Sequence, residues 1–148
     1  MNGRVLVWPL VLVLGLALVG QTVRWRERMT ASRILNTVER MTMNARRAYV
    51  LHTNIELLRR AERLDPLEIG IPIARGSQHY LLRQPQAAVE AYEEALRLEP
   101  RPEVYLNLGR ALDLAGRRDE AARAFFLASR IDPRLLPEVP PEYRPGTE

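Results

Sequence analysis

The fold of this chain is decided by residues 102–133, which read PEVYLNLGRALDLAGRRDEAARAFFLASRIDP. The same arrangement of small, aromatic and proline residues occurs once before, always 33 residues earlier: Gly76, Ala88, Tyr92, Ala95 and Pro100 recur as Gly109, Ala121, Phe125, Ala128 and Pro133. A fixed period of this length is typical of a solenoid of helical hairpins, each too small to bury its apolar face alone. The repeat therefore predicts an all-α protein built from stacked hairpins.

These residues resemble the tetratricopeptide repeat (TPR) family. Its hairpins need small residues where the two helices cross, a large residue in the middle of the second helix and a proline at the end. With Gly109 as the small residue of the first helix, the remaining signature positions of the last copy hold Tyr105, Leu108, Leu112 and Gly116. The copy at about 69–100 matches well in its second helix. Its first helix has Pro72 and Arg75 at positions usually occupied by an aromatic residue and leucine, and is expected to begin late.

A third, degenerate copy lies upstream. Leu58, Ala61 and Pro66 precede Tyr92, Ala95 and Pro100 by 34 residues, Thr42 takes the small position, and Asn54 replaces the usual alanine. We expect its first helix at roughly 35–48. A capping box from Thr53 to Glu56 predicts a break near His52, followed by a helix that stops at Asp65-Pro66. Since two repeats are fewer than stability generally requires, this hairpin is expected to be the third unit.

The N-terminus carries an uncharged run from Val5 to Val23, with Trp8 near its beginning and Trp25 just beyond its end. As a helix this run is about 28 Å long, close to the thickness of the hydrocarbon core of a bilayer. It extends beyond the apolar core of a typical signal peptide, so we expect a retained single-pass transmembrane anchor. One arginine precedes the run and five follow it (Arg24, Arg26, Arg28, Arg33 and Arg40), which favours a cytoplasmic C-terminal domain.

The resulting domain organisation has four parts. Residues 1–23 are the anchor, 24–66 a basic stem helix and the degenerate hairpin, 67–133 two TPR repeats, and 134–148 a tail with four prolines. The tail favours an extended, polyproline-like conformation. Because a capping helix is missing, we expect the apolar residues of the tail to fold back over the last hairpin rather than await a second chain; they are Leu135, Leu136, Val139 and Tyr143.

Composition argues against catalysis. The 148 residues include no cysteine, two histidines and three serines, and none of them stands in the spacing of a metal site, a nucleophile elbow or a phosphate loop. We expect no enzyme, no cofactor, no metal and no small-molecule substrate. The basic residues 24–63 have few aromatics among them, so proximity to lipid headgroups explains them better than nucleic acid does.

With catalysis and nucleic-acid binding set aside, the function that remains is the recognition of another protein. Resemblance to the TPR family implies that the first helices of the hairpins form a concave binding face. The family's positions fall on Ile73, Ser77, Tyr80 and Leu81 in the middle repeat, and on Glu103, Leu106, Arg110 and Asp113 in the last. This set lacks the lysines and asparagines with which some members clamp a terminal carboxylate, and suits an apolar segment or an amphipathic helix.

The function expected from the sequence is that of a membrane-anchored bacterial TPR adaptor, or accessory subunit, that binds other proteins of a membrane complex. A second copy of the same chain is a further partner that the sequence allows. The alternative is a subunit of a pilin-like homopolymer assembled through the hydrophobic N-terminal helix. The chain departs from pilins because it lacks their glycine cleavage site before the apolar run and the glutamate soon after that site, and because its head is expected to be helical.

Overall fold

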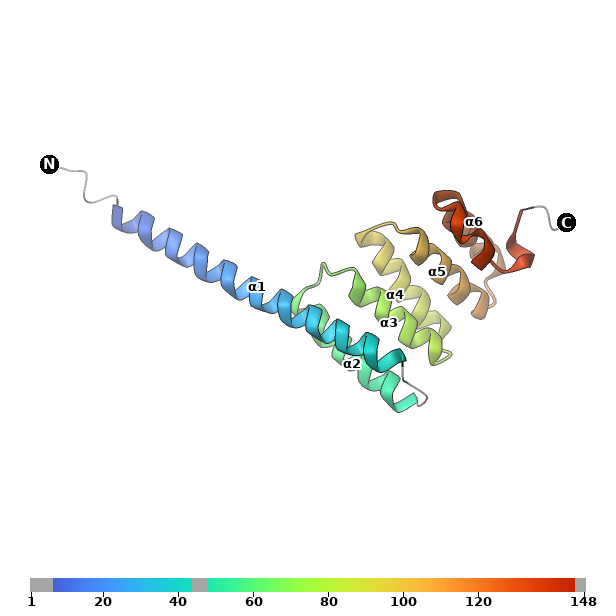
Figure 1. Cartoon of the computed structure of the whole chain (residues 1–148), viewed down its shortest axis with the longest axis horizontal. Coiled ribbons are helices and arrows are strands. Elements are labelled where there is room, and N and C mark those ends of the chain that lie inside the picture. Colours follow the sequence, from blue (N-terminus) through green and yellow to red (C-terminus); the bar gives the residue numbers. More distant parts are fainter. Residues whose placement is uncertain (1–6, 44–47, 146–148) are drawn as a thin grey trace.

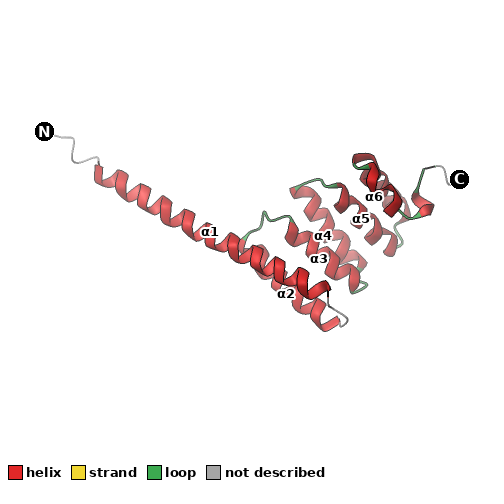
Figure 2. Ribbon diagram, in the orientation of Figure 1, coloured by secondary structure: helices red, strands yellow, loops and turns green. Residues whose placement is uncertain are grey.

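The computed structural model describes residues 7–43 and 48–145, and in these ranges the chain is helical with no strand (Figure 2). Six α-helices are followed by two short 3-10 helices: α1 (Val7–Met43), α2 (Ala48–Leu64), α3 (Gly70–Leu81), α4 (Pro85–Leu98), α5 (Pro102–Leu114), α6 (Arg118–Ile131), η1 (Pro133–Glu138) and η2 (Pro141–Tyr143). They form three hairpins, α1/α2, α3/α4 and α5/α6, stacked in chain order, with the N-terminal part of α1 projecting from the stack (Figure 1).

Within the second hairpin, and again within the third, the two helices cross at close distance. A Cβ atom added to Gly76 would lie 2.7 Å from the ring of Tyr92, and one added to Gly109 would lie 2.6 Å from the ring of Phe125. Such distances are far shorter than van der Waals contact, so only glycine lets the aromatic ring of the second helix reach the backbone of the first. The 33-residue spacing of glycine and aromatic residues is therefore the spacing of these crossings.

The turns between helices follow the same repeat. Gly116, after α5, has φ +77°, in the left-handed region that glycine adopts without strain. Arg83, 33 residues earlier and after α3, occupies the same region with φ +57°. Pro85 and Pro102 stand at the start of α4 and α5, where a missing N–H costs no hydrogen bond.

Two apolar clusters form the interior. One lies among α4, α5, α6 and the tail, with Tyr92, Leu112, Phe125 and Val139 among its members. The other joins α1, α2 and α3 and consists of Ala31, Val38, Leu58, Ala61 and Ile71. Arg75 of α3 connects the hairpins further, because its guanidinium donates to Glu62 of α2 at 2.7 Å and also to Glu94 of α4.

The first hairpin differs from expectation at its turn. The chain leaves α1 after Met43 and enters α2 at Ala48, so the predicted break near His52 is wrong. Thr53 lies inside α2, where its hydroxyl donates to the carbonyl of Tyr49 at 3.1 Å instead of capping a new helix. The end of α2 at Leu64, before Asp65-Pro66, agrees with the prediction.

Helix α3 does not begin late. It starts at Gly70, and Ile69 before it already has helical angles. Pro72 fits because it lies in the first turn, where backbone N–H groups have no partner within the helix.

The expected membrane anchor is wrong. Within 7–43 and 48–145, no helix is long and apolar enough to cross a bilayer, which contradicts the expected single-pass membrane localisation. The bilayer contact expected through 5–23 is not shown. Helix α1 continues without interruption past Val23, and the apolar run ends in Gly20, Gln21 and Thr22 ahead of Arg24. Val5 and Leu6 lie outside the described residues.

The tail caps the stack in a different conformation from the one expected. It forms the 3-10 helices η1 and η2 rather than an extended polyproline-like strand. It does fold back: Val139 is buried, Leu135 packs against the core, and the ring of Tyr143 lies 4.9 Å from that of Phe125. Leu136 stays exposed. The apolar end of the last hairpin is thus covered by the chain itself.

Candidate functional site

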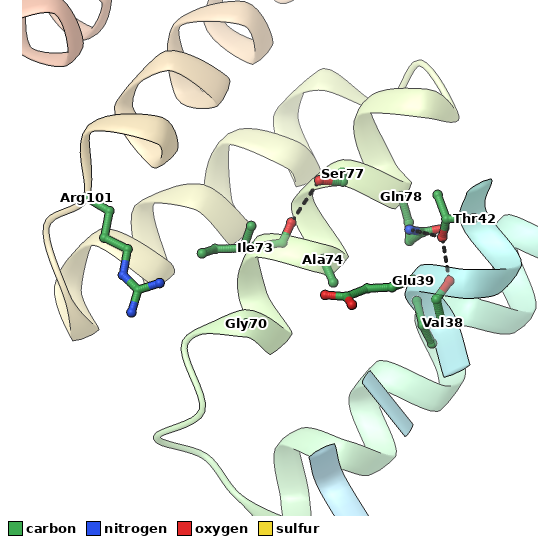
Figure 3. A pocket seen from close by; sticks show the side chains of 9 residues that line it. All are labelled: Val38, Glu39, Thr42, Gly70, Ile73, Ala74, Ser77, Gln78 and Arg101. Atoms are coloured by element: carbon green, nitrogen blue, oxygen red, sulfur yellow. Dashed lines mark hydrogen bonds between the residues drawn. The ribbon is translucent and has the colours of Figure 1, made fainter. Parts of the chain in front are cut away.

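A groove of about 600 Å³ opens between α1, α3 and the start of α5 (Figure 3). Its lining combines an apolar part, a polar part and two charged residues: Val38, Gly70, Ile73 and Ala74; Thr42, Ser77 and Gln78; Glu39 and Arg101. These helices are the first helices of the three hairpins. The groove therefore lies on the face that the sequence predicts for binding.

The two charged residues lie on opposite sides of α3. Figure 3 shows Glu39 beside α3 on the α1 side and Arg101 across the groove, at the beginning of α5. Arg101 donates to Glu99 at 2.9 and 2.8 Å, and this pairing raises the pKa of the guanidinium and lowers that of the carboxylate. Arg101 and Glu99 are therefore both fully charged at neutral pH. The apolar floor of the groove lies between Glu39 on one side and Arg101 on the other.

A network of polar side chains supports the α1 wall of the groove. Asn54 Nδ2 donates to Thr42 Oγ1 at 3.2 Å and to Gln78 Oε1 at 3.1 Å, while Gln78 Nε2 donates to Thr42 Oγ1 at 2.9 Å. The threonine hydroxyl donates to the carbonyl of Val38 at 2.8 Å. Asn54 and Gln78 are buried, so these bonds fix α1 and α2 relative to α3.

A smaller pocket of about 220 Å³ adjoins the groove, with Ser77 in the walls of both. Its other lining residues are Tyr80, Leu81, Tyr92, Asn107 and Arg110. Ser77 Oγ and Tyr92 OH lie 3.2 Å apart, and Arg110 Nη1 donates to Asn107 Oδ1 at 3.2 Å. Burial raises the pKa of the Tyr92 phenol, with the Ser77 hydrogen bond and the charge of Arg110 acting in the opposite direction. The phenol is neutral at physiological pH.

The structure brings five of the eight predicted residues to these two cavities. Ile73 and Ser77 line the groove, and Ser77, Tyr80, Leu81 and Arg110 line the smaller pocket.

The other three predicted residues lie elsewhere. Glu103 is exposed in the first turn of α5 and lines neither cavity. Asp113 accepts a hydrogen bond from the hydroxyl of Tyr143. Leu106 is only 3% exposed and belongs to the core cluster that includes Val139 of the tail. Leu106 lines neither cavity, and its assignment to the binding face stays a prediction.

Several lining residues were missed from the sequence. Val38, Glu39 and Thr42 belong to α1, in the part predicted as the first helix of the degenerate hairpin but not as part of the binding face, and Arg101 precedes α5 by one residue. One signal was present: Thr42 is the equivalent of Gly76, and this register places residues of α1 beside those of α3.

No protein-family model matches this chain, and no curated protein sequence matches it. Among solved structures, the one described as the crystal structure of MamA protein is 22% identical with a TM-score of 0.63, covering 72% of this chain and 56% of the MamA chain. TTC0263, a thermophilic TPR protein of Thermus thermophilus, is 25% identical with a TM-score of 0.68, covering 88% of this chain and 73% of that one. This chain thus spans little more than half the length of the MamA chain. Its fold is an all-α helical repeat of the TPR type.

Proposed function

We propose that this chain is a protein–protein interaction module that holds an apolar or amphipathic segment of a partner protein in the groove along α1, α3 and α5. The observation that carries the proposal is the groove itself, with its apolar floor of Val38, Ile73 and Ala74 between Glu39 and Arg101. The likeness to a TPR protein supports a role in binding protein.

The size and chemistry of the groove suit such a ligand. A volume of about 600 Å³ is within the range of binding cavities and can accept apolar side chains spaced one helical turn apart. Glu39 would orient an amphipathic segment by favouring a cation on its side of the groove, whereas the charge of Arg101 is already balanced by its two hydrogen bonds to Glu99. The filament alternative required an N-terminal membrane segment, so the adaptor is the function that we propose.

The test uses the full chain with an affinity tag, expressed in its natural host, crosslinked and analysed by quantitative mass spectrometry. Combining Ile73→Ala with Tyr80→Ala truncates one aliphatic and one aromatic residue of the binding face, and should release the bound partner. Losing side chains at the centre of an interface typically costs above about 2 kcal/mol, roughly thirty-fold in affinity.

The matched control makes the same two kinds of truncation on the outer surface of α6, as Ile131→Ala with Phe126→Ala, where both side chains are about half exposed. It should leave the partner bound. If instead the α6 pair released the partner and the groove pair did not, the binding surface would be α6 and the proposal would be wrong.

A further inference from the structure

The tail touches the smaller pocket through one ion pair. Glu138, at the end of η1, accepts a hydrogen bond from Arg110 Nη2 at 3.1 Å, and Arg110 is a wall of the pocket. The remainder of the tail is held to the last hairpin separately, because Tyr143 donates to Asp113, its ring lies 4.9 Å from that of Phe125, and Val139 is buried in the core. The tail can therefore stay docked when Glu138 leaves Arg110.

The pocket presents donors and no carboxylate of its own. Its lining includes the Arg110 guanidinium, the hydroxyl of Tyr80 and the amide of Asn107. The hydroxyls of Ser77 and Tyr92 also line it, but Ser77 donates to the carbonyl of Ile73 at 3.1 Å and Tyr92 donates to Ser77 Oγ at 3.2 Å. A guanidinium beside neutral hydroxyl and amide donors is the complement of a carboxylate, whose two oxygens only accept hydrogen bonds. The one carboxylate bonded to this guanidinium among the described residues is that of Glu138, which approaches from outside the pocket.

The Glu138 contact is weak enough to be exchanged. The side chains of Arg110 and Glu138 are 35% and 54% exposed. An ion pair so open to water contributes little, because the solvent screens it and two long side chains must be ordered. A carboxylate inside the pocket would meet the same guanidinium with less solvent around it and with further donors at hand.

We propose that the smaller pocket binds an aspartate or glutamate side chain of the partner segment, and that Glu138 holds its place on Arg110 until that segment arrives. This inference rests on the proposed function, since the pocket and the groove share Ser77 and would be filled by one segment. The partner is thus an acidic peptide: an apolar residue in the groove followed or preceded closely by a carboxylate. The arrangement differs from a clamp on a terminal carboxylate, because a side chain is enough.

The experiment selects ligands for the purified full chain from a phage-displayed library of random 12-residue peptides and measures the affinity of the enriched peptides by fluorescence anisotropy. We expect an acidic residue at a constant distance from apolar ones. Changing that residue to its amide should weaken binding by about ten-fold, and Arg110→Gln should weaken the acidic peptide equally while leaving the amide peptide unaffected.

The tail is tested with a matched pair of variants. Glu138→Gln removes the competing carboxylate and should tighten binding of the acidic peptide roughly two- to five-fold, the range expected for an exposed ion pair. Glu142→Gln makes the same change four residues further along the tail, at an exposed carboxylate that lines neither cavity, and should leave affinity unchanged.

The outcomes separate the two proposals. If peptides bind with no acidic preference, and Arg110→Gln and Glu138→Gln have no effect while Ile73→Ala alone weakens binding, the carboxylate pocket is refuted and the groove stands. If no peptide is enriched, or if Ile73→Ala has no effect on those that are, both are refuted. The acid-to-amide change in the peptide decides the matter even if Arg110→Gln fails to fold, since it leaves the protein unaltered.

Discussion

The first hairpin and the two that follow have different residues at the equivalent positions where their two helices cross. In α3/α4 and α5/α6 a glycine receives an aromatic ring, and Ala88 or Ala121 fills the buried position beside it. In α1/α2 the equivalent residues are Thr42, Leu58 and Asn54, and the polar pair bonds onward to Gln78 of the next hairpin. The later hairpins use their crossing residues to hold themselves together, whereas the first uses them to attach itself to its neighbour.

The largest effect is expected where the glycine crossing is blocked. Gly109→Thr copies the residue of the first hairpin into the last, and places a Cβ where the Phe125 ring lies 2.6 Å away. The helices must separate, so we expect a loss of about 2–3 kcal/mol in the free energy of unfolding. Chemical denaturation followed by circular dichroism measures this loss.

A second substitution tests whether the residue at position 109 and the residue at position 125 depend on each other. Phe125→Leu alone should cost about 1–2 kcal/mol by leaving a cavity. In the double variant, leucine faces threonine as it does in the first hairpin, so the two costs should sum to less than additivity predicts. Additive losses would show that the small and large residues do not depend on each other.

The next effect concerns the seam between the two kinds of hairpin. Arg75→Ala leaves Glu62 and Glu94 without their shared cation, and the arginine side chain is only 16% exposed. Because the burial of these ion pairs is intermediate between that of an exposed pair and that of a fully buried pair, we expect a loss of about 2 kcal/mol in the free energy of unfolding. Arg59→Ala, which breaks the exposed pair with Glu56, is the control and should change stability by less than about 0.5 kcal/mol. Equal losses would contradict a special role for the seam.

A smaller effect is expected in the polar network. Gln78→Met keeps the shape of the side chain but leaves buried Asn54 with Thr42 as its one remaining partner, at a cost of about 1–2 kcal/mol. Adding Asn54→Leu removes the other amide together with its Oδ1, which has no hydrogen-bond partner among the described residues. Thermal melting should therefore recover in the double variant. A double variant less stable than Gln78→Met would mean that the amide of Asn54 contributes stability by itself.

The smallest effect is expected at the end of the stack that the tail covers, where Tyr143 bonds to Asp113. The hydrogen bond to Asp113 raises the pKa of Tyr143 to about 12 from an ordinary value of 10.0. Since the folded state favours the neutral phenol, this stabilisation is complete below about pH 10 and is lost as the pH rises towards 12. Tyr143→Phe should lower stability by about 1 kcal/mol at pH 8, and by less at pH 11.5. A difference in melting temperature that stays constant across this range would contradict the bond.

The repeat could be predicted from the sequence because its decisive contacts are local. Gly109 and Phe125 belong to one hairpin, so their spacing reflects direct contact and needs no knowledge of the remainder of the chain. The end of α2 at Asp65-Pro66 was equally local, since proline disfavours helical angles in the residue before it.

The remainder depended on contacts between distant residues. Nothing in the composition of the tail distinguishes 3-10 turns from an extended strand, because the difference depends on the burial of Val139 in the core cluster of α4, α5 and α6. The groove was incomplete in the prediction because the binding face was drawn from the two clear repeats alone, although Val38 and Glu39 of the degenerate hairpin lie beside α3. Repeat patterns thus identify a binding face but not the neighbouring elements that complete it.

Helix α1 has a mechanical consequence. Its 37 residues form a rod of about 55 Å, in which Ala31 is the first described residue to be buried in the stack and Val38 and Glu39 are a wall of the groove. The arm before Ala31 is about 36 Å long, roughly three times the distance from Ala31 to the groove wall. Because one continuous helix forms both the arm and the groove wall, and the bonds of Thr42, Asn54 and Gln78 fix that helix to α3, the direction of the arm and the direction of the groove are set together.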